Sequence, residues 1–548
     1  MRPKRNQALD NILLRVLWNS LISIANEQGR SLRRTAFSPV VRESGDFAVA
    51  VLDAKGRLVA NAVTGAPGHI NTMRTAGVYF TEAFPPETLR PGDQLITNDP
   101  WLASAHLFDI VVYSPIFYRE KLIGYIGSCL HHTDVGGYGV GAGARDIHEE
   151  GLWLPMLKLY EAGEPNKTLV EIIRRNVRVP EHVLGDLTAQ VSCGRIGADR
   201  IVALCERYGL NDLQELSDSI ITRSEDATRD AIRKLKAGTY RGQTVFDIPG
   251  CGDITIKVAI TIDPEQGKMI SDFTGSSPAN PLGINVCLNY TKAYNAFGIR
   301  CCLNPEVPNN NGSMDPFEVV APEDSIVNAR YPSPVSARHV VAMQIPLAIM
   351  NALYKVMPDK VVAESAGGSW AAQIFGHDQH QRAFASTMFT YSGGMGARRK
   401  KPGLSATSYP AGISAISIEV LEAEMPIVFD RKELLRGTGG KGKYPGGDGQ
   451  IVEFHVKTNQ TWMLNAIVSR TRHDSHGLDG AGSGTRGKFL VNGKPVREAR
   501  KQVLNPEDHV VFQTPGGGGF GRLPNGKSGA SASKTGVQKK TKASNKRR

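Results

Sequence analysis

The chain has 548 residues, of which 41% are apolar and 22% are charged, so it is long enough for about two to four domains with buried cores. No window approaches the ~18 uninterrupted apolar residues of a membrane-spanning helix. The basic start also lacks the unbroken apolar stretch and the small-residue cleavage site of a signal peptide. These features argue against a membrane protein and predict a soluble, cytoplasmic one.

The formal net charge of +12 is concentrated at the C-terminus. Residues 523–548 hold eight Lys or Arg residues and no acid, which leaves a net charge of +4 on the other 522 residues. A segment so rich in Ser, Gly and Lys cannot bury a core, and it has no aromatic side chain on which a base could stack. We therefore expect a disordered basic tail and no nucleic-acid binding.

The first half of the chain begins with a helical pattern and continues with strand-like ones. Apolar residues recur every three to four positions from residue 9 to 24, which predicts an amphipathic helix. Segment 38–63 alternates around a turn at 53–56 and predicts a β-hairpin. Two further strand-like runs cover 93–99 and 107–132.

Helical periodicity returns over residues 181–237, and residues 240–275 alternate again in the manner of antiparallel strands. The sequence therefore predicts a mixed α/β (α+β) fold of two intertwined lobes with many Gly-rich loops. We divide the chain into an N-terminal region, a C-terminal mixed α/β region and a basic tail, covering residues 1–238, 239–522 and 523–548.

Candidate metal ligands gather in the N-terminal region. His106 and Asp109 lie three residues apart, so a turn would bring their side chains to the same face. His131 begins the segment HHTDVGG at the end of an apolar run. Imidazole nitrogens and carboxylate oxygens suit first-row divalent ions such as Zn²⁺, Mn²⁺ and Fe²⁺. Asp46 stands in an otherwise apolar strand segment, where an acid needs a partner or a cation, so it is a candidate fourth ligand.

Two neighbouring residues, His132 and Asp134, are interpreted as groups that orient these ligands. Buried His–Asp pairs also occur as ordinary structural hydrogen bonds. Spacing alone therefore leaves both the metal interpretation and the structural one open.

Several polar residues in loops beside Gly or Pro are candidates for catalysis. The imidazoles of His69 and His339 and the guanidinium of Arg338 suit the binding of anionic intermediates or phosphate. The carboxyl group of Glu150 suits acid–base catalysis. Arg178 and Glu149 stand in similar positions. Each of these residues could instead serve only as a structural hydrogen-bonding group. The candidates are His69, Glu150, Arg338 and His339.

The Gly-rich run RGTGGKGKYPGGDGQ, residues 436–450, does not indicate a nucleotide site. It lacks the GK[ST] ending of a P-loop and the strand–GxGxxG–helix context of a dinucleotide fold. We expect these glycines to form loops that line the cavity or approach another subunit, and we expect no ATP site on this chain.

An ordered set of segments resembles the hydantoinase B/oxoprolinase family over roughly residues 8–521. The family includes B-type subunits of N-methylhydantoin and caprolactam hydrolases, the second half of 5-oxoprolinase, and subunits of acetone and acetophenone carboxylases. In chain order the segments include RTAFSPVVRESGDFAVAVLDAKGRLVA, APGHINTM, GDQLITNDPW, HHTDVGG, IHEEGLWLP, NVRVPEHVLGDLTAQ, DFTGSSPANPLGINV, PSPVSARH, RGTGGKGKYPGGDGQ and TPGGGGFG.

This resemblance implies that the metal ligands are Asp46, His106, Asp109 and His131, and that the metal is Zn or Mn, with Fe as a further option. It also implies a hydantoinase A-type partner subunit that binds ATP, in a hetero-oligomer such as a dimer of heterodimers. The partner would phosphorylate the substrate, and the metal would then deliver hydroxide to the activated carbon.

Three departures from the family pattern stand out. Leu102-Ala103-Ser104-Ala105 precedes the first ligating His where relatives often have glycines, and Ala48 replaces Ser after Asp46-Phe47. Segment 469–484 is longer than in relatives, which puts the loop there, and with it the substrate side, in doubt.

Three functions remain open at this point. The first is a subunit of an ATP-dependent cyclic amide hydrolase that opens hydantoin, 5-oxoproline or lactam rings. The second is a subunit of an ATP-dependent ketone carboxylase, in which the metal holds a phosphoenol or enolate. The third is a non-catalytic scaffold for the A-type partner. We favour the hydrolase, which is the commoner activity in the family.

Overall fold

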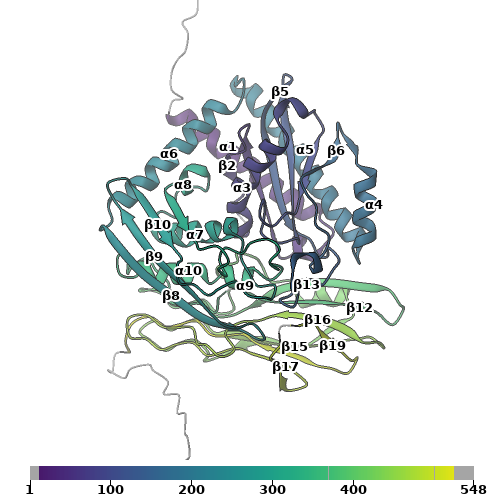
Figure 1. The fold of residues 1–548 in the computed structure, drawn as a ribbon, viewed down its shortest axis with the longest axis vertical. Coiled ribbons are helices and arrows are strands. Elements are labelled where there is room, and N and C mark those ends of the chain that lie inside the picture. The colour runs from purple at the N-terminus through teal and green to yellow at the C-terminus, as the bar shows by residue number, and fades with distance from the viewer. Residues whose placement is uncertain (1–10, 64, 368, 499, 524–548) are drawn as a thin grey trace, which may run out of the picture.

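The computed structural model describes residues 11–523, except 64, 368 and 499. The described elements form four sheets and the helices that pack on them (Figure 1). One sheet with helices on both faces occupies the upper right of the view, and two sheets of the C-terminal part lie across the bottom. The mixed α/β class predicted from the sequence is confirmed. The predicted basic tail lies almost wholly outside the described residues.

The N-terminal part is built on a seven-stranded antiparallel sheet of order β2-β1-β5-β4-β3-β6-β7. Its central strands are buried on both faces, because α3 packs on one face and α1 and α5 pack on the other. The strands are β1 (Phe47–Asp53), β2 (Leu58–Asn61), β3 (Gln94–Thr97), β4 (Asp109–Tyr118), β5 (Lys121–His131), β6 (Leu157–Glu161) and β7 (Glu164–Pro165).

The helices of this part confirm the predicted first helix and the predicted helical region after residue 181. Short 3-10 turns occupy Pro86–Thr88 and Ile147–Glu149. The helices are α1 (Asn11–Thr35), α2 (Pro39–Arg42), α3 (Pro67–Ala83), α4 (Lys167–Asn176), α5 (Pro180–Tyr208) and α6 (Gln214–Arg233).

The predicted hairpin forms between β1 and β2, but the prediction began it too early. Residues Pro39–Arg42 form the short helix α2 instead of strand. Proline is favoured in the first helical turn, because its fixed φ matches the helix and its missing N–H would have had no partner there. The strand itself begins at Phe47, directly after Asp46.

The chain continues into a four-stranded sheet of order β11-β10-β9-β8, against which α10 packs. The antiparallel pairing predicted for residues 240–275 is confirmed, and β11 adds a parallel strand at one edge. The elements are β8 (Gly238–Ile248), β9 (Gly252–Asp263), β10 (Lys268–Asp272), α7 (Leu288–Leu303), α8 (Asn311–Met314), β11 (Phe317–Val320), α9 (His339–Ala342) and α10 (Ile345–Leu353).

The C-terminal part is a sandwich of two sheets, with orders β13-β12-β16-β19 and β14-β15-β20-β17-β18. Their facing sides share one apolar core that contains Trp370, Phe454, Trp462 and Phe512. The elements are β12 (Ser369–His377), β13 (Ala383–Ser392), α11 (Ile418–Glu424), β14 (Ile427–Leu435), β15 (Gly449–Val456), β16 (Trp462–Ile467), β17 (Lys488–Val491), β18 (Lys494–Pro495), β19 (Gln502–Leu504) and β20 (Val510–Gln513).

The Gly-rich runs stack backbone against backbone beside this sandwich. Gly440 N donates to Gly517 O at 2.8 Å, and a Cβ on Gly517 would lie 2.2 Å from Met395 O. Such close approach requires glycine.

The largest apolar core runs through both halves of the chain and crosses residue 238, from Leu14 in α1 to Ile467 in β16. The predicted division at residue 238 therefore remains a prediction, because the packing does not separate there. Within the described residues, the helices are too short or too polar for any of them to traverse a bilayer.

Candidate metal centre

Three neighbouring strands bring three of the predicted ligands to the same end of the N-terminal sheet. Asp109 is the first residue of β4 and His131 the last of β5, and the two are paired in register. Asp46 directly precedes β1, and its carbonyl accepts a hydrogen bond from His131 N at 3.1 Å. The fourth, His106, stands in the turn just before β4. The fold thus brings the four predicted ligands together at one end of three adjacent strands.

The carboxylate of Asp109, whose side chain is fully buried, lies at the centre of this group. Its Oδ1 is 2.8 Å from His106 Nε2 and 3.0 Å from His131 Nδ1. Its Oδ2 is 2.8 Å from His69 Nε2 and is also paired with Arg338. We call His106, Asp109 and His131 the Asp109 cluster; each offers one ligand atom, all within 4.8 Å of one another.

The protonation states of the Asp109 cluster suit cation binding. Burial would raise the pKa of Asp109, but the charges of His106, His69 and Arg338 outweigh burial and hold it well below its ordinary value. Burial lowers the pKa of both His106 and His131 to about 4. Near neutral pH, an ionised carboxylate therefore faces two uncharged imidazoles.

His106 is oriented as a ligating histidine would be. Its Nδ1 lies 2.8 Å from the carbonyl oxygen of Ser336, which assigns the ring proton to Nδ1. Its Nε2 is buried and makes no hydrogen bond within the described residues, although Asp109 Oδ1 is close by. A lone pair on Nε2 that faces a carboxylate oxygen is satisfied by a cation placed between them. The donor set therefore fits a divalent metal held by His106, Asp109 and His131.

Asp46 lies beside the Asp109 cluster rather than inside it. Its Oδ1 is 3.6 Å from His69 Nδ1, so His69 stands between the two carboxylates. Burial and the charge of Asp109 raise the pKa of Asp46. Burial opposes a charge on His69, but Asp109 and Asp46 outweigh it and raise the pKa of His69. His69, which we predicted only as a catalytic group, thus contacts both acids directly.

These side chains surround a cavity of about 30 Å³, which has room for an ion and about one or two water molecules. Asp109 lies just behind its wall. Arg338 donates from Nε to Ser104 O at 3.0 Å and lies 4.2 Å from the centre of the Tyr290 ring. The predicted residues that line the cavity are Asp46, His69, His106, His131, Arg338 and His339.

Glu150 does not line this cavity. It is fully buried, and its Oε1 accepts hydrogen bonds from the backbone N–H groups of Val335 and Ser336 at 2.6 and 2.7 Å. Burial raises its pKa to about 8, although those two N–H groups act in the opposite direction. Glu150 thereby holds the loop whose Ser336 carbonyl faces His106.

The other candidates near the HHTDVGG segment lie outside the cavity as well. His132 Nε2 is 3.2 Å from Gln190 Oε1. Asp134 pairs with Arg178 at 2.6 Å. Glu149 accepts a hydrogen bond from Arg145 N at 2.9 Å. Within the described residues, the hydrogen bonds and ion pairs found for His132 and Asp134 do not reach the Asp109 cluster.

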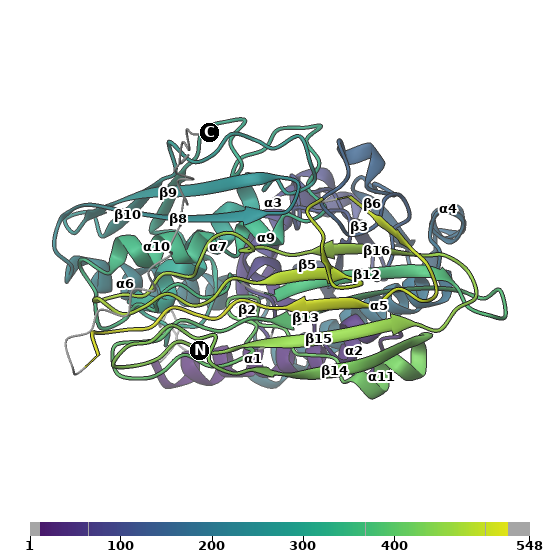
Figure 2. The same cartoon turned by 90° about the horizontal axis from the view of Figure 1, so that it is seen from below.

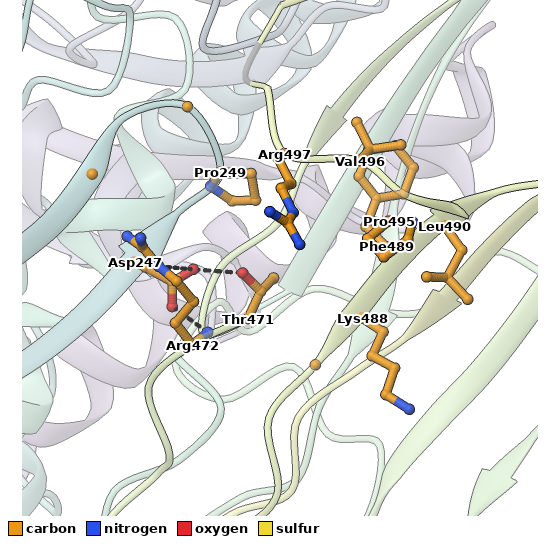
Figure 3. Close-up of a pocket in the computed structure, with 13 residues that line it drawn as sticks. Asp247, Pro249, Thr471, Arg472, Lys488, Phe489, Leu490, Pro495, Val496 and Arg497 are labelled. Carbon is orange, nitrogen blue, oxygen red and sulfur yellow. Dashed lines mark hydrogen bonds and ion pairs between the residues drawn. The ribbon is translucent and has the colours of Figure 1, made fainter. Parts of the chain in front are cut away.

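A much larger cavity, of about 700 Å³, opens between the β8–β9 turn and the C-terminal segments (Figure 3). Asp247 there accepts hydrogen bonds from Thr471 Oγ1 at 2.6 Å and from Arg472 N at 2.7 Å. The segment around residue 471, which departs from the family pattern, therefore forms part of this wall. Since no predicted site residue lines this cavity, we do not place the active site there.

Several side chains around the Asp109 cluster were not predicted from the sequence. Ser336 orients His106, the Tyr290 ring covers Arg338, and the thiol of Cys129 lies 3.0 Å from Ser104 Oγ near His69 and Asp109. Ser336 stands in the segment PSPVSARH, so its proximity to Arg338 was a usable signal. Tyr290 carries no comparable signal in its local sequence.

Comparison with known proteins identifies the family of the chain as a whole. The sequence profile of the hydantoinase B/oxoprolinase family matches residues 10–523. An uncharacterized protein of Methanocaldococcus jannaschii is 34% identical, over 94% of this chain and 91% of its own length. A Pseudomonas sp. protein provisionally named as the B-type subunit of a D-/L-hydantoinase is 28% identical, over 94% and 90%. The 5-oxoprolinase of Dictyostelium discoideum is 27% identical over 94% of this chain, which spans only 40% of that protein.

Two solved structures share the fold. The nucleotide-free structure of acetone carboxylase superposes with a TM-score of 0.85 at 20% identity, over 94% of this chain and 77% of that one. The ATP-dependent caprolactamase of Pseudomonas jessenii superposes with a TM-score of 0.84 at 22% identity, over 95% and 93%. With a profile match over nearly the whole chain and a relative at 34% identity, the chain belongs to the hydantoinase B/oxoprolinase family.

Proposed function

We propose that the chain is the metal-bearing subunit of an ATP-dependent hydrolase that opens cyclic amides such as hydantoins, 5-oxoproline or lactams. The observation that carries this proposal is the Asp109 cluster, in which one ionised carboxylate oxygen faces two uncharged imidazoles at 2.8 and 3.0 Å. The relatives named as part of a hydantoinase and as 5-oxoprolinases support the hydrolase class.

The charges at the cavity suit an anionic activated substrate. Two carboxylates, Asp46 and Asp109, and one guanidinium, that of Arg338, surround the space where the cation would sit. A divalent cation would therefore add two positive charges to a buried region, where charges interact strongly. A substrate phosphorylated on its amide oxygen carries the complementary charge.

When bound, the metal would act as a Lewis acid and lower the pKa of water toward ~7. The chain's own groups supply the remaining functions. Asp109, His106 and His131 would hold the cation, and the Asp46 carboxylate faces the same cavity as a fourth donor group. His69 can hold a proton at Nδ1, opposite Asp46. Arg338 and His339 line the wall where an anionic oxygen would be bound.

The cavity also limits what can enter. A volume of about 30 Å³ is too small for a five-membered ring, so a substrate would have to displace part of the wall. Met343, Ala411 and Ile413 are among the apolar side chains that line it.

A ketone carboxylase subunit is the alternative. The TM-scores to the acetone carboxylase and to the caprolactamase differ by only 0.01, so the fold does not discriminate between the two activities. In either case we propose that ATP is bound by a hydantoinase A-type partner, because the present chain lacks a P-loop and a relative is named as the B-type component of a hydantoinase.

The test combines metal analysis with activity of the reconstituted complex. The chain would be purified with its A-type partner and supplied with ATP and either a cyclic amide or a ketone plus bicarbonate. We expect about one metal ion per chain at this site and ring opening of a cyclic amide. His106→Ala and Asp109→Asn should lose that metal ion and product formation together.

His182→Ala, in the first turn of α5 and away from the cavity, is the matched control and should retain both. Carboxylation of a ketone without ring opening would establish the alternative activity. Unchanged metal content and turnover in both site variants would leave only the scaffold role.

A further inference from the structure

We propose that Asp430, His455 and His509 form a second divalent cation site, on the exposed face of the C-terminal sandwich. We call these three residues the outer-sheet cluster. They play no part in the Asp109 cluster, and this proposal does not depend on the function proposed above. The cluster offers two imidazole nitrogens and one carboxylate oxygen, all within 4.8 Å of one another.

Each residue of the outer-sheet cluster comes from one of three adjacent strands. Asp430 lies in β14, His455 in β15, and His509 directly before β20, and the sheet order is β14-β15-β20. β14 and β15 lie along the lower part of Figure 2, where the sandwich is seen from below. Side chains that converge from three hydrogen-bonded strands are held in place before any ligand arrives.

The register explains why the two imidazoles meet. The last pair of the β15–β20 ladder is Phe454 with Val510, so the next position sets His455 opposite His509. The Cβ atoms of residues opposite each other in an antiparallel pair are about 4.5–5.5 Å apart. The ring centres of His455 and His509 are 4.9 Å apart. Phe454 and Val510 point into the sandwich core. Since side chains alternate along a strand, the histidines point outward.

The carboxylate reaches the pair through a β-bulge. The β14–β15 register shifts between Phe429 and Arg431, so Asp430 is the extra residue on its strand. Bulges redirect a side chain relative to the regular ladder. Here Asp430 Oδ2 lies 3.1 Å from His455 Nδ1 and 3.1 Å from His509 Nδ1.

These distances suit a small tetrahedral cation. Zinc–nitrogen and zinc–oxygen bonds of ~2.0–2.1 Å at tetrahedral angles place the ligand atoms ~3.3 Å apart. Both nitrogen–oxygen separations are within a few tenths of an ångström of that value. Moreover, both imidazoles use Nδ1 toward the same oxygen atom, so one ion can contact all three groups with water as the fourth ligand.

The charged groups next to the outer-sheet cluster interact with other residues, so the cluster remains free to bind a cation. Asp508 accepts hydrogen bonds from Asn492 Nδ2 at 2.6 Å and from Asn505 N at 2.7 Å, so its carboxylate is already used. Arg431 is paired with Glu433. With two imidazoles and one carboxylate, the site should prefer Zn²⁺, Ni²⁺ or Cu²⁺ to Mg²⁺ or Ca²⁺, which favour all-oxygen sites.

Equilibrium dialysis of the full-length chain against zinc chloride, followed by elemental analysis, tests the proposal. We expect His455→Ala and His509→Ala each to bind one zinc ion fewer per chain than the wild type. Loss of one ligand should weaken zinc binding at this site by at least the about 10- to 100-fold seen when a supporting residue is removed. Zinc should also raise the Tm of the wild type, because the site exists only in the folded chain, and this rise should shrink in both variants.

His380→Ala, an exposed histidine elsewhere in the sandwich, is the matched control and should keep the wild-type zinc content. His106→Ala separates the two sites, because it should leave the zinc ion of the outer-sheet cluster in place. Retention of wild-type zinc stoichiometry by either His455→Ala or His509→Ala would overturn the proposal and leave an ordinary hydrogen-bonded pair of histidines.

Discussion

The Asp109 cluster and the outer-sheet cluster use the same kinds of side chain in opposite surroundings. The side chain of Asp109 is 0% exposed and contacts Arg338 and His69 as well as its two cluster histidines. That of Asp430 is 33% exposed and faces His455 and His509. Burial makes the Asp109 carboxylate essential to its neighbours, whereas a β-bulge and the register of three strands position the Asp430 carboxylate. The two clusters have similar geometry, but substitution of their carboxylates should have very different effects on the free energy of unfolding.

Asp109→Ala should show the largest effect on stability. It would leave the Arg338 guanidinium buried without its carboxylate, and breaking a buried ion pair costs about 3–5 kcal/mol. Urea denaturation followed by tryptophan fluorescence measures the free energy of unfolding. Asp359→Ala, which removes an exposed pair with Arg399, is the control and should change it by less than about 1 kcal/mol. Equal changes in the two variants would contradict the role assigned to burial.

Glu150→Gln should change the pH dependence of stability. The folded-state pKa of Glu150 is raised to about 8, above its ordinary 4.5, so between these values the folded state binds more protons than the unfolded state. Stability from this group is therefore lost as pH rises through that window, by about 1.4 kcal/mol per pH unit. Glutamine keeps an acceptor for the Val335 and Ser336 N–H groups but cannot ionise.

The difference between the wild-type and Glu150→Gln unfolding free energies should consequently shift in favour of the variant between pH 5 and pH 7. Taking the difference removes the contribution of the other titrating groups. Parallel curves for the two proteins over this range would show that Glu150 is already ionised in the folded chain.

Gly68→Ala should disturb the wall of the buried cavity without removing a ligand. A Cβ at Gly68 would lie 2.4 Å from the Tyr290 ring, which stacks on Arg338. Overpacking of this kind costs about 1–3 kcal/mol, and we expect turnover to fall while metal content stays normal. Gly29→Ala, whose nearest neighbour would be Phe47 at 3.4 Å, is the control and should have little effect. Loss of metal in Gly68→Ala would show that the packing of Tyr290 also holds the ligands.

The same contrast explains what could be predicted from the sequence. Periodicity predicted α1, the β1–β2 hairpin and one strand-like run over residues 107–132, which the structure divides into β4 and β5, because local spacing and burial determine these elements. The ends of that run lie close to Asp109 and His131. Strand alternation was misleading over Pro39–Arg42, where a proline in the first turn starts a helix.

Contacts distant in sequence could not be predicted. The ion pair between Asp109 and Arg338 spans 229 residues, and the Ser336 carbonyl that orients His106 is 230 residues away. His455 and His509 lie 25 and 79 residues from Asp430 and form no motif. Their meeting depends on a bulge and on the register of three strands, which only the assembled sheet determines.

Asp430→Asn should have the smallest effect on stability, and it distinguishes the two clusters most clearly. Without metal, it weakens only hydrogen bonds from two partly exposed imidazoles, so the free energy of unfolding should change by less than about 1 kcal/mol. In the presence of zinc the same substitution removes a charged ligand, so the gap in Tm between variant and wild type should widen. Thermal unfolding with and without zinc chloride measures both. A large loss of stability already in the metal-free protein would show that the carboxylate serves the fold, as Asp109 does.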